Sequence, residues 1–151
     1  MLWTDEYPDP NEEPAAAMAL ENWLAFREFA QPELLYEEWE LVSTVGPMDR
    51  LGYGGTLDMV ITLPDGRVVL VDVKTSRKLT AYHAYQVAAY ARAWRDADLQ
   101  PALDEGWVLR LNKYGQGYEI REVDLETGWD GFYHAHQLYR GLELYPAWKE
   151  E

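Results

Sequence analysis

Two aspartates and one lysine interrupt apolar stretches of this sequence and could together bind a divalent cation. Asp58 falls inside the apolar run 57–61, and Asp72 follows a run of valines and a leucine, two residues before Lys74. Mg²⁺ prefers oxygen ligands and often takes only one or two carboxylates from a protein. A neighbouring amine can contact a phosphate oxygen or orient an attacking water. These residue types therefore suit metal-assisted hydrolysis of a phosphodiester.

The spacing brings the three residues together if the chain forms a β-hairpin around Pro64-Asp65-Gly66. Pro presets φ for the first turn position, and Gly accepts the left-handed conformation that follows. With the turn centred there, Asp58 lies directly opposite Asp72, and both project from the same face as Lys74. Opposed like charges in apolar surroundings are destabilising, and a bound cation would offset that cost. The alternatives are a surface acidic pair with a snorkelling lysine, or Asp72 paired only with Lys74.

The elements that must position these residues follow from the hydrophobic pattern. Both arms of the hairpin are apolar on both faces, which predicts a central position in a sheet that is covered on each side. Pro14 suits the first turn of a helix, and Thr80 can cap another. We expect an α/β (α+β) fold with a central mixed β-sheet flanked by helices, in the order α-β-β-β-α-β-β-α. The expected elements are a helix from 14 to about 30, strands 36–45, 56–63 and 67–75 with a turn at 46–50, a helix 80–94, strands 107–112 and 118–123, and a helix 128–144.

Length and composition narrow the class of protein. A chain of 151 residues predicts a single domain over 14–151, preceded by an acidic, irregular lead-in over 1–13. The absence of cysteine excludes disulfides, cysteine nucleophiles and an iron–sulfur cluster. No apolar run approaches the roughly 18 residues of a membrane span, and the first residues are acidic rather than basic and apolar. We therefore expect a cytoplasmic protein without a membrane partner.

The charge balance argues against a strong, non-specific grip on duplex DNA. Thirteen basic residues stand against 27 acidic ones, a formal net charge of −14. Proteins that bind DNA mainly by neutralising phosphates are usually basic. The sequence shows no basic recognition helix, zinc motif or basic–aromatic patch, so sequence-specific readout is not expected. A bound Mg²⁺ would reverse the sign of the charge around the carboxylates.

Three motifs in order resemble a known nuclease family. They are Gly55-Thr56-Leu57-Asp58, then Asp72-Val73-Lys74-Thr75, then Gln86-Val87-Ala88-Ala89-Tyr90. In this order and at these separations they resemble the RecB-like branch of the PD-(D/E)XK nuclease superfamily, and within it the small phage-borne exonucleases related to CRISPR adaptation nucleases. The resemblance runs from about Pro32 to the final helix and implies a restriction-endonuclease-like core.

The resemblance assigns roles by position. It implies that Asp58 and Asp72 are metal ligands, that the backbone carbonyl of Val73 contributes, and that Lys74 is the catalytic lysine. Relatives with an iron–sulfur cluster carry cysteines that this chain lacks. The cofactor implied is therefore Mg²⁺ or Mn²⁺, without an iron–sulfur cluster.

Further residues are implied to complete the site. Gln86 and Tyr90, four residues apart on one helix face, would line it, with ordinary packing as the alternative. The resemblance also implies an acid upstream of Asp58, which would act in catalysis and bind the metal. Glu38 is the first choice for this acid, and Glu40 is the substitute. His83 shares the helix face, but a polar role at the end of the helix is the preferred interpretation.

The function expected is that of a metal-dependent DNA exonuclease in phage or bacterial recombination or DNA processing. Its partners would be DNA ends or single strands, with room for a homo-oligomer or a recombination or helicase partner. Two alternatives stay open. One is a structure-specific endonuclease of the junction-resolvase type. The other is a catalytically weak module that mimics DNA or binds a protein, which the net charge of −14 would suit.

Overall fold

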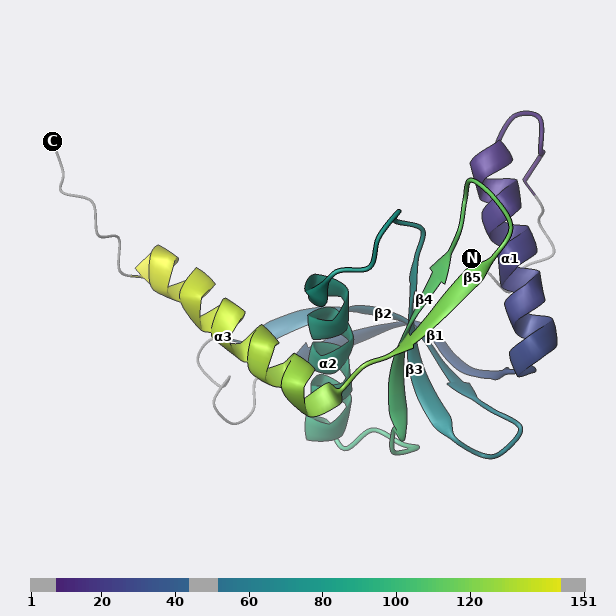
Figure 1. The fold of residues 1–151 in the computed structure, drawn as a ribbon. Helices are drawn as coiled ribbons and strands as arrows, with labels where there is room; N and C mark the ends of the chain where they lie inside the picture. Colours follow the sequence, from purple (N-terminus) through teal and green to yellow (C-terminus); the bar gives the residue numbers. More distant parts are fainter. Residues whose placement is uncertain (1–7, 44–51, 145–151) are drawn as a thin grey trace, which may run out of the picture.

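The computed structural model describes residues 8–43 and 52–144, so the turn expected at 46–50 lies outside the described part. Within it the chain forms a mixed α/β fold in which three helices flank a mixed sheet of five strands (Figure 1). The elements follow the predicted order. They are α1 (Pro14–Ala30), β1 (Glu33–Ser43), β2 (Tyr53–Thr62), β3 (Val68–Lys74), α2 (Ala81–Asp96), β4 (Glu105–Leu111), β5 (Tyr118–Glu122) and α3 (Leu125–Leu144).

The strands lie side by side in the order of the sequence, from β1 to β5. All neighbours are antiparallel except β3 and β4, which are parallel and are joined through α2. Parallel strands need such a crossover, because the chain must return to the same end of the sheet before the next strand begins. The crossover therefore brings the carboxyl ends of β3 and β4 together at one edge of the sheet.

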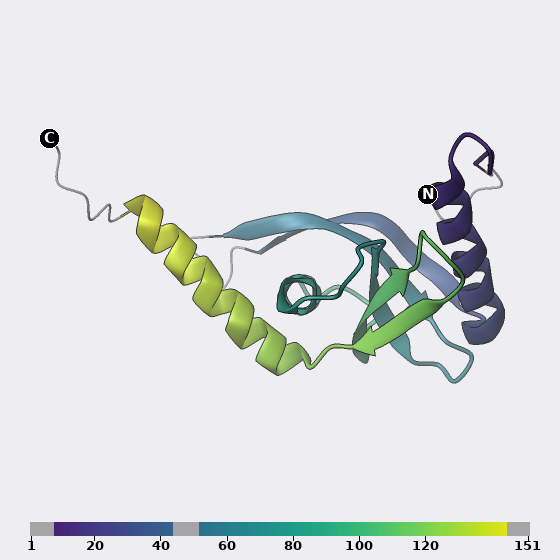
Figure 2. The same ribbon diagram turned by 45° about the horizontal axis from the view of Figure 1, so that its top comes forward.

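A helix covers each face of the sheet. Helices α1 and α2 lie on opposite faces, and α3 packs on α2 and runs outwards from the sheet (Figure 2). One buried cluster, which includes Trp23 and Phe26, joins α1 to Val69 and Val71 of β3. The other cluster places Leu70 of the same strand beneath α2. The expectation that β3 is central and covered on both sides is confirmed.

The predicted hairpin register is also confirmed. Val60 pairs with Leu70, and the ladder runs from Thr62↔Val68 to Met59↔Val71, so it ends one pair short of the predicted pair Asp58 and Asp72. Gly66 occupies the left-handed region at φ 91°, as the turn chemistry requires. The alternation of side chains then places Asp72 on the α2 face of β3, as it does Leu70.

Several boundaries differ from the prediction for local reasons. Strand β2 begins at Tyr53 rather than 56, because Gly54 and Gly55 sit inside it: a Cβ on Gly54 would lie 2.9 Å from the carbonyl oxygen of Leu41. Helix α3 begins at Leu125 rather than 128. The carboxylate of Asp124 accepts a hydrogen bond from the amide of Thr127 at 3.0 Å and so caps the helix earlier.

None of the helices in the described part of the chain is long and apolar enough to cross a membrane.

Candidate active site

The two aspartates and the lysine converge where the β2–β3 ladder ends. Asp72 is 2% exposed, and its Oδ2 lies 2.9 Å from Nζ of Lys74 without accepting a well-aligned hydrogen bond. Asp58 reaches across from β2, and its Oδ2 accepts a hydrogen bond of 2.6 Å from the backbone amide of Val73. The three side chains predicted from the sequence thus meet at the end of β3.

This arrangement makes Asp72 a carboxylate that is costly to ionise. Burial raises the pKa of Asp72 to about 6 from an ordinary value of 3.8. The ammonium of Lys74 opposes the rise, and the carboxylate of Asp58 adds to it. Desolvation is therefore the dominant cause, and one lysine does not compensate for it. A divalent cation between the two carboxylates would supply the missing positive charge.

The donor set fits a hard divalent cation in part. Two carboxylates are present, and the buried Oδ2 of Asp72 has no directed donor. Mg²⁺ keeps several waters and needs few protein ligands, so two carboxylates are an adequate anchor. Among the described residues, however, no three acids or histidines are grouped closely enough to surround an ion. The backbone amide of Val73 donates a hydrogen bond to Asp58. The role of the Val73 carbonyl as a metal ligand stays a prediction.

The acids expected as the further ligand lie exposed on the edge strand β1. Glu38 falls between the pairs Glu37↔Met59 and Trp39↔Leu57, which places it level with Asp58 along the sheet. Its backbone adopts the left-handed region at φ 49°, a local irregularity inside the continuous strand β1. Both Glu38 and Glu40 are exposed, and the structure does not group either of them with the two aspartates.

Gln86 and Tyr90 come together on α2, as the four-residue spacing predicts. Nε2 of Gln86 donates a hydrogen bond of 3.1 Å to Oη of Tyr90. The ring of Tyr90 lies against Gly55, where an added Cβ would sit 2.8 Å from Oη. Gly55 thus leaves room for the tyrosine beside the strand that carries Asp58. The same pair lines an aromatic cavity of about 410 Å³ together with Tyr53, Tyr85 and Phe132.

His83 has the structural role that the sequence favoured. Its Nδ1 accepts a hydrogen bond of 3.1 Å from the backbone amide of Thr80, the residue before α2. Its pKa is lowered, first by burial and then by the positive charge of Lys74. The imidazole therefore caps the helix and still lies within the electrostatic reach of the lysine.

Sequence reasoning missed one buried polar residue that shapes the surroundings of the site. Asn22 of α1 is 3% exposed, and its amide donates to the carbonyl oxygens of Asn112 and Gly115 at 2.6 and 2.9 Å. Its Oδ1 accepts from the amide of Gly117 at 2.7 Å. The only signal in the sequence is a polar residue directly before the buried Trp23 of an amphipathic helix. Its partners are 90 to 95 residues away, beyond any local pattern.

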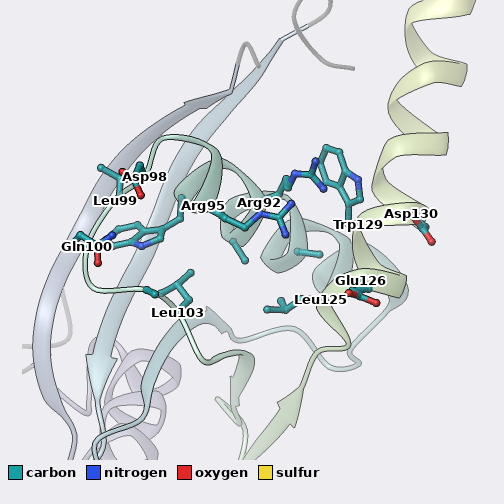
Figure 3. A pocket seen from close by; sticks show the side chains of 14 residues that line it. Arg92, Arg95, Asp98, Leu99, Gln100, Leu103, Leu125, Glu126, Trp129 and Asp130 are labelled. Carbon is teal, nitrogen blue, oxygen red and sulfur yellow. The ribbon is translucent and has the colours of Figure 1, made fainter. Parts of the chain in front are cut away.

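A further cavity lined by described residues lies elsewhere. It holds about 610 Å³ between α2, the start of α3 and the loop that precedes β4 (Figure 3). The guanidinium of Arg92 lies 4.7 Å from the ring centroid of Trp129, and its Nε pairs with Asp96 at 3.1 Å. Arg92 is therefore already engaged, and neither aspartate of the candidate site lines this cavity.

Comparisons with known proteins show no family for this chain. No family model matches the chain, and no curated protein matches it. Among solved structures, the crystal structure of SSO0001 is 14% identical, with a TM-score of 0.49. The match covers 86% of this chain and 61% of that one, so the chain spans less than two thirds of that structure.

Proposed function

We propose that this protein is a metal-dependent deoxyribonuclease that hydrolyses phosphodiesters at DNA ends. The observation that carries the proposal is the buried Asp72, raised in pKa to about 6, beside Asp58 and 2.9 Å from Lys74. A structural ion pair does not need a second carboxylate in the same apolar setting. Perturbed carboxylates of this kind are concentrated at functional sites. The three-motif resemblance of the sequence to RecB-like PD-(D/E)XK nucleases supports the same reaction.

Each residue would have a distinct role. Asp58 and Asp72 would hold Mg²⁺ or Mn²⁺, which supplies a Lewis acid for the scissile phosphate and lowers the pKa of a bound water. Lys74, which is 22% exposed, can leave Asp72 and meet a phosphate oxygen or the attacking water. Its positive charge then stabilises the additional negative charge of the transition state. Gln86 and Tyr90 would position the strand from the α2 side.

The test compares linear and closed circular DNA, with and without Mg²⁺ or Mn²⁺. We expect wild-type protein to degrade linear DNA only in the presence of metal, and Asp72→Asn and Lys74→Met to lose at least about 100-fold in rate, because each removes a group that acts on the transition state. Asp130→Asn is the matched control, since Asp130 is exposed on α3. Cutting of circles would indicate an endonuclease instead.

A second candidate function is favoured by the net charge of −14 and by the missing third acid among the described residues. It is a binding module that keeps the fold without catalysis. If no substrate is cleaved in the presence of metal, although wild-type protein and all variants are folded, the binding module is selected and the nuclease is rejected.

A further inference from the structure

Two short segments of this acidic chain carry cations and no acids. Residues 74–78 contain Lys74, Arg77 and Lys78, and residues 110–114 contain Arg110 and Lys113. Five of the 13 basic residues thus fall in ten positions, although acids outnumber bases twofold over the whole sequence. The segments are far apart in sequence, so their common composition has no local explanation.

The fold places the two segments side by side. Strands β3 and β4 are parallel, and Lys74 pairs directly with Arg110 at their carboxyl ends. Paired residues project from the same face of the sheet. Asp72 pairs with Val108 two residues earlier, so Asp72, Lys74 and Arg110 share one face. The cations of both segments therefore gather at one edge of the sheet, next to the acid pair.

Side-chain contacts join the segments beyond the strands. Arg77 Cζ lies 5.4 Å from the ring centroid of Tyr114, and Nζ of Lys113 lies 5.4 Å from the same centroid. Tyr114 is nevertheless 66% exposed. The β3–α2 loop and the β4–β5 turn thus form one surface, an aromatic ring flanked by cations.

Little negative charge offsets this surface. Arg110 is paired with Glu119 of β5, with Nε 3.0 Å from Oε2. No other ion pair involving the surface cations is present within the described residues, apart from that of Lys74 with Asp72. Arg77, Lys78 and Lys113 are left for a ligand. We call Lys74, Arg77, Lys78, Arg110, Lys113 and Tyr114 the basic edge.

We propose that the basic edge binds the backbone of single-stranded DNA and leads it to Asp58 and Asp72. Proteins that bind single strands combine a cationic track with aromatic side chains on which bases stack. A duplex is a poorer ligand, because it presents twice the phosphate charge to a protein that is acidic elsewhere. The choice of DNA rests on the proposed function, and the location of the surface rests on the contacts described above.

The test is binding of a fluorescently labelled oligonucleotide, measured by anisotropy in EDTA so that cleavage cannot interfere. The variant Arg77→Gln/Lys113→Gln removes two cations, and Arg67→Gln/Arg95→Gln removes two exposed cations from outside the basic edge. We expect the first to weaken binding about tenfold and to reduce the slope of log K against log salt by about 1.4, since each single-strand phosphate contact contributes about 0.7. The second should stay within about twofold.

Tyr114→Ala provides an independent arm. It should weaken binding by about fivefold or more through lost stacking and leave the salt slope unchanged, because no charge is removed. Circular dichroism and thermal denaturation confirm the fold of each variant. Equal losses for both double variants, no binding by wild-type protein, or a loss seen only with duplex DNA would overturn the proposal. Binding that depends on the basic edge without any cleavage would keep this proposal and reject the nuclease.

Discussion

Asp72 combines three conditions that rarely occur together in one side chain. It is buried, it lies beside a second carboxylate, and it has one lysine for compensation. Its pKa is raised from 3.8 to about 6. The folded protein therefore holds a proton there more tightly than the unfolded chain does. The stability that this proton gives is fully present below pH 4 and is lost as the pH rises through 6.

We predict that the metal-free protein loses up to about 3 kcal/mol of unfolding free energy from this group between pH 4 and pH 8, since one pKa unit corresponds to about 1.4 kcal/mol. Urea denaturation in EDTA at both pH values measures the change. Asp72→Asn, which has no carboxyl to titrate, should show a smaller decrease than wild-type protein. His83, whose lowered pKa acts in the opposite direction, is common to both proteins and cancels in the comparison. Equal decreases in the two proteins would contradict the assignment.

Asp58 and Asp72 together carry more negative charge than Lys74 compensates, which predicts that a bound metal ion stabilises the fold. At pH 8, Mg²⁺ or Mn²⁺ at 100 times its dissociation constant should add about 2.7 kcal/mol of stability to wild-type protein. Asp72→Asn and Asp58→Asn should gain much less, because each leaves one carboxylate. Asp130→Asn should gain as much as wild-type protein. Thermal denaturation over a metal titration measures this binding without any substrate, so a shift of equal size in all four proteins would refute a site at the acid pair.

Among the residues of the site, the sequence predicts those that lie close together in the chain and not those that come from other strands. Asp58, Asp72 and Lys74 belong to one hairpin, whose turn chemistry and alternation set the register. Glu38 and Glu40 lie on another strand, whose register the hairpin does not set, and the left-handed backbone of Glu38 has no signal in the sequence. Arg110 was not predicted beside the site, since its position follows from the parallel pairing of β3 with β4.

Helix α1 lies on the face of the sheet opposite α2, but it holds the β4–β5 turn that forms part of the basic edge. Asn22 holds the β4–β5 turn through three backbone groups. We predict that Asn22→Ala lowers the unfolding free energy by about 3 kcal/mol, because buried backbone groups lose their partners. The turn carries Lys113 and Tyr114, so oligonucleotide binding should weaken as well. Asn11→Ala, at an exposed position before α1, is the control and should change neither property.

The contact between β2 and α2 depends on a glycine, Gly55, which has no side chain to displace Tyr90. A Cβ on Gly55 would meet Oη and Cε1 of Tyr90 at 2.8 Å. We predict that Gly55→Ala costs about 1–3 kcal/mol through overpacking. Gly141→Ala in α3, where an added Cβ meets nothing within 4 Å, should instead be neutral or stabilising by up to about 1 kcal/mol. Denaturant titration of both variants compares the two, and equal effects would contradict the packing argument.

Element types and their order are predictable from the sequence because periodicity, capping and turn residues agree along the chain. Boundaries are predictable only where the signal is local. The early start of β2 depends on β1, where Val42 lies opposite Gly54 and the carbonyl oxygen of Leu41 leaves no room for a Cβ, and a sequence pattern contains no such information. The early start of α3 had a readable signal in Asp124, an acid well suited to cap a helix.

For the molecule as a whole, the distribution of charge matters more than its sum. The basic edge gathers cations at one end of the sheet, and exposed acids lie on α3 and just after the end of α2. We predict that Asp98→Asn/Glu126→Gln/Asp130→Asn increases the association rate with single-stranded DNA several-fold at low salt, through reduced long-range repulsion. The increase should vanish near 1 M salt, where the Debye length is about 3 Å. Stopped-flow fluorescence at both salt concentrations measures it, and a salt-independent increase would point to a new contact instead.

The left-handed residue on β1 also bears on how copies of this chain meet. β1 is an outer strand of the sheet in the described part, and its free edge could accept another strand. The left-handed backbone at Glu38 distorts that row of backbone groups, and three glutamates within residues 37–40 add repulsion between copies. Bends and charges of this kind prevent open edges from templating aggregation. The irregularity that leaves Glu38 exposed thus gives a small sheet protection against growing into a fibre.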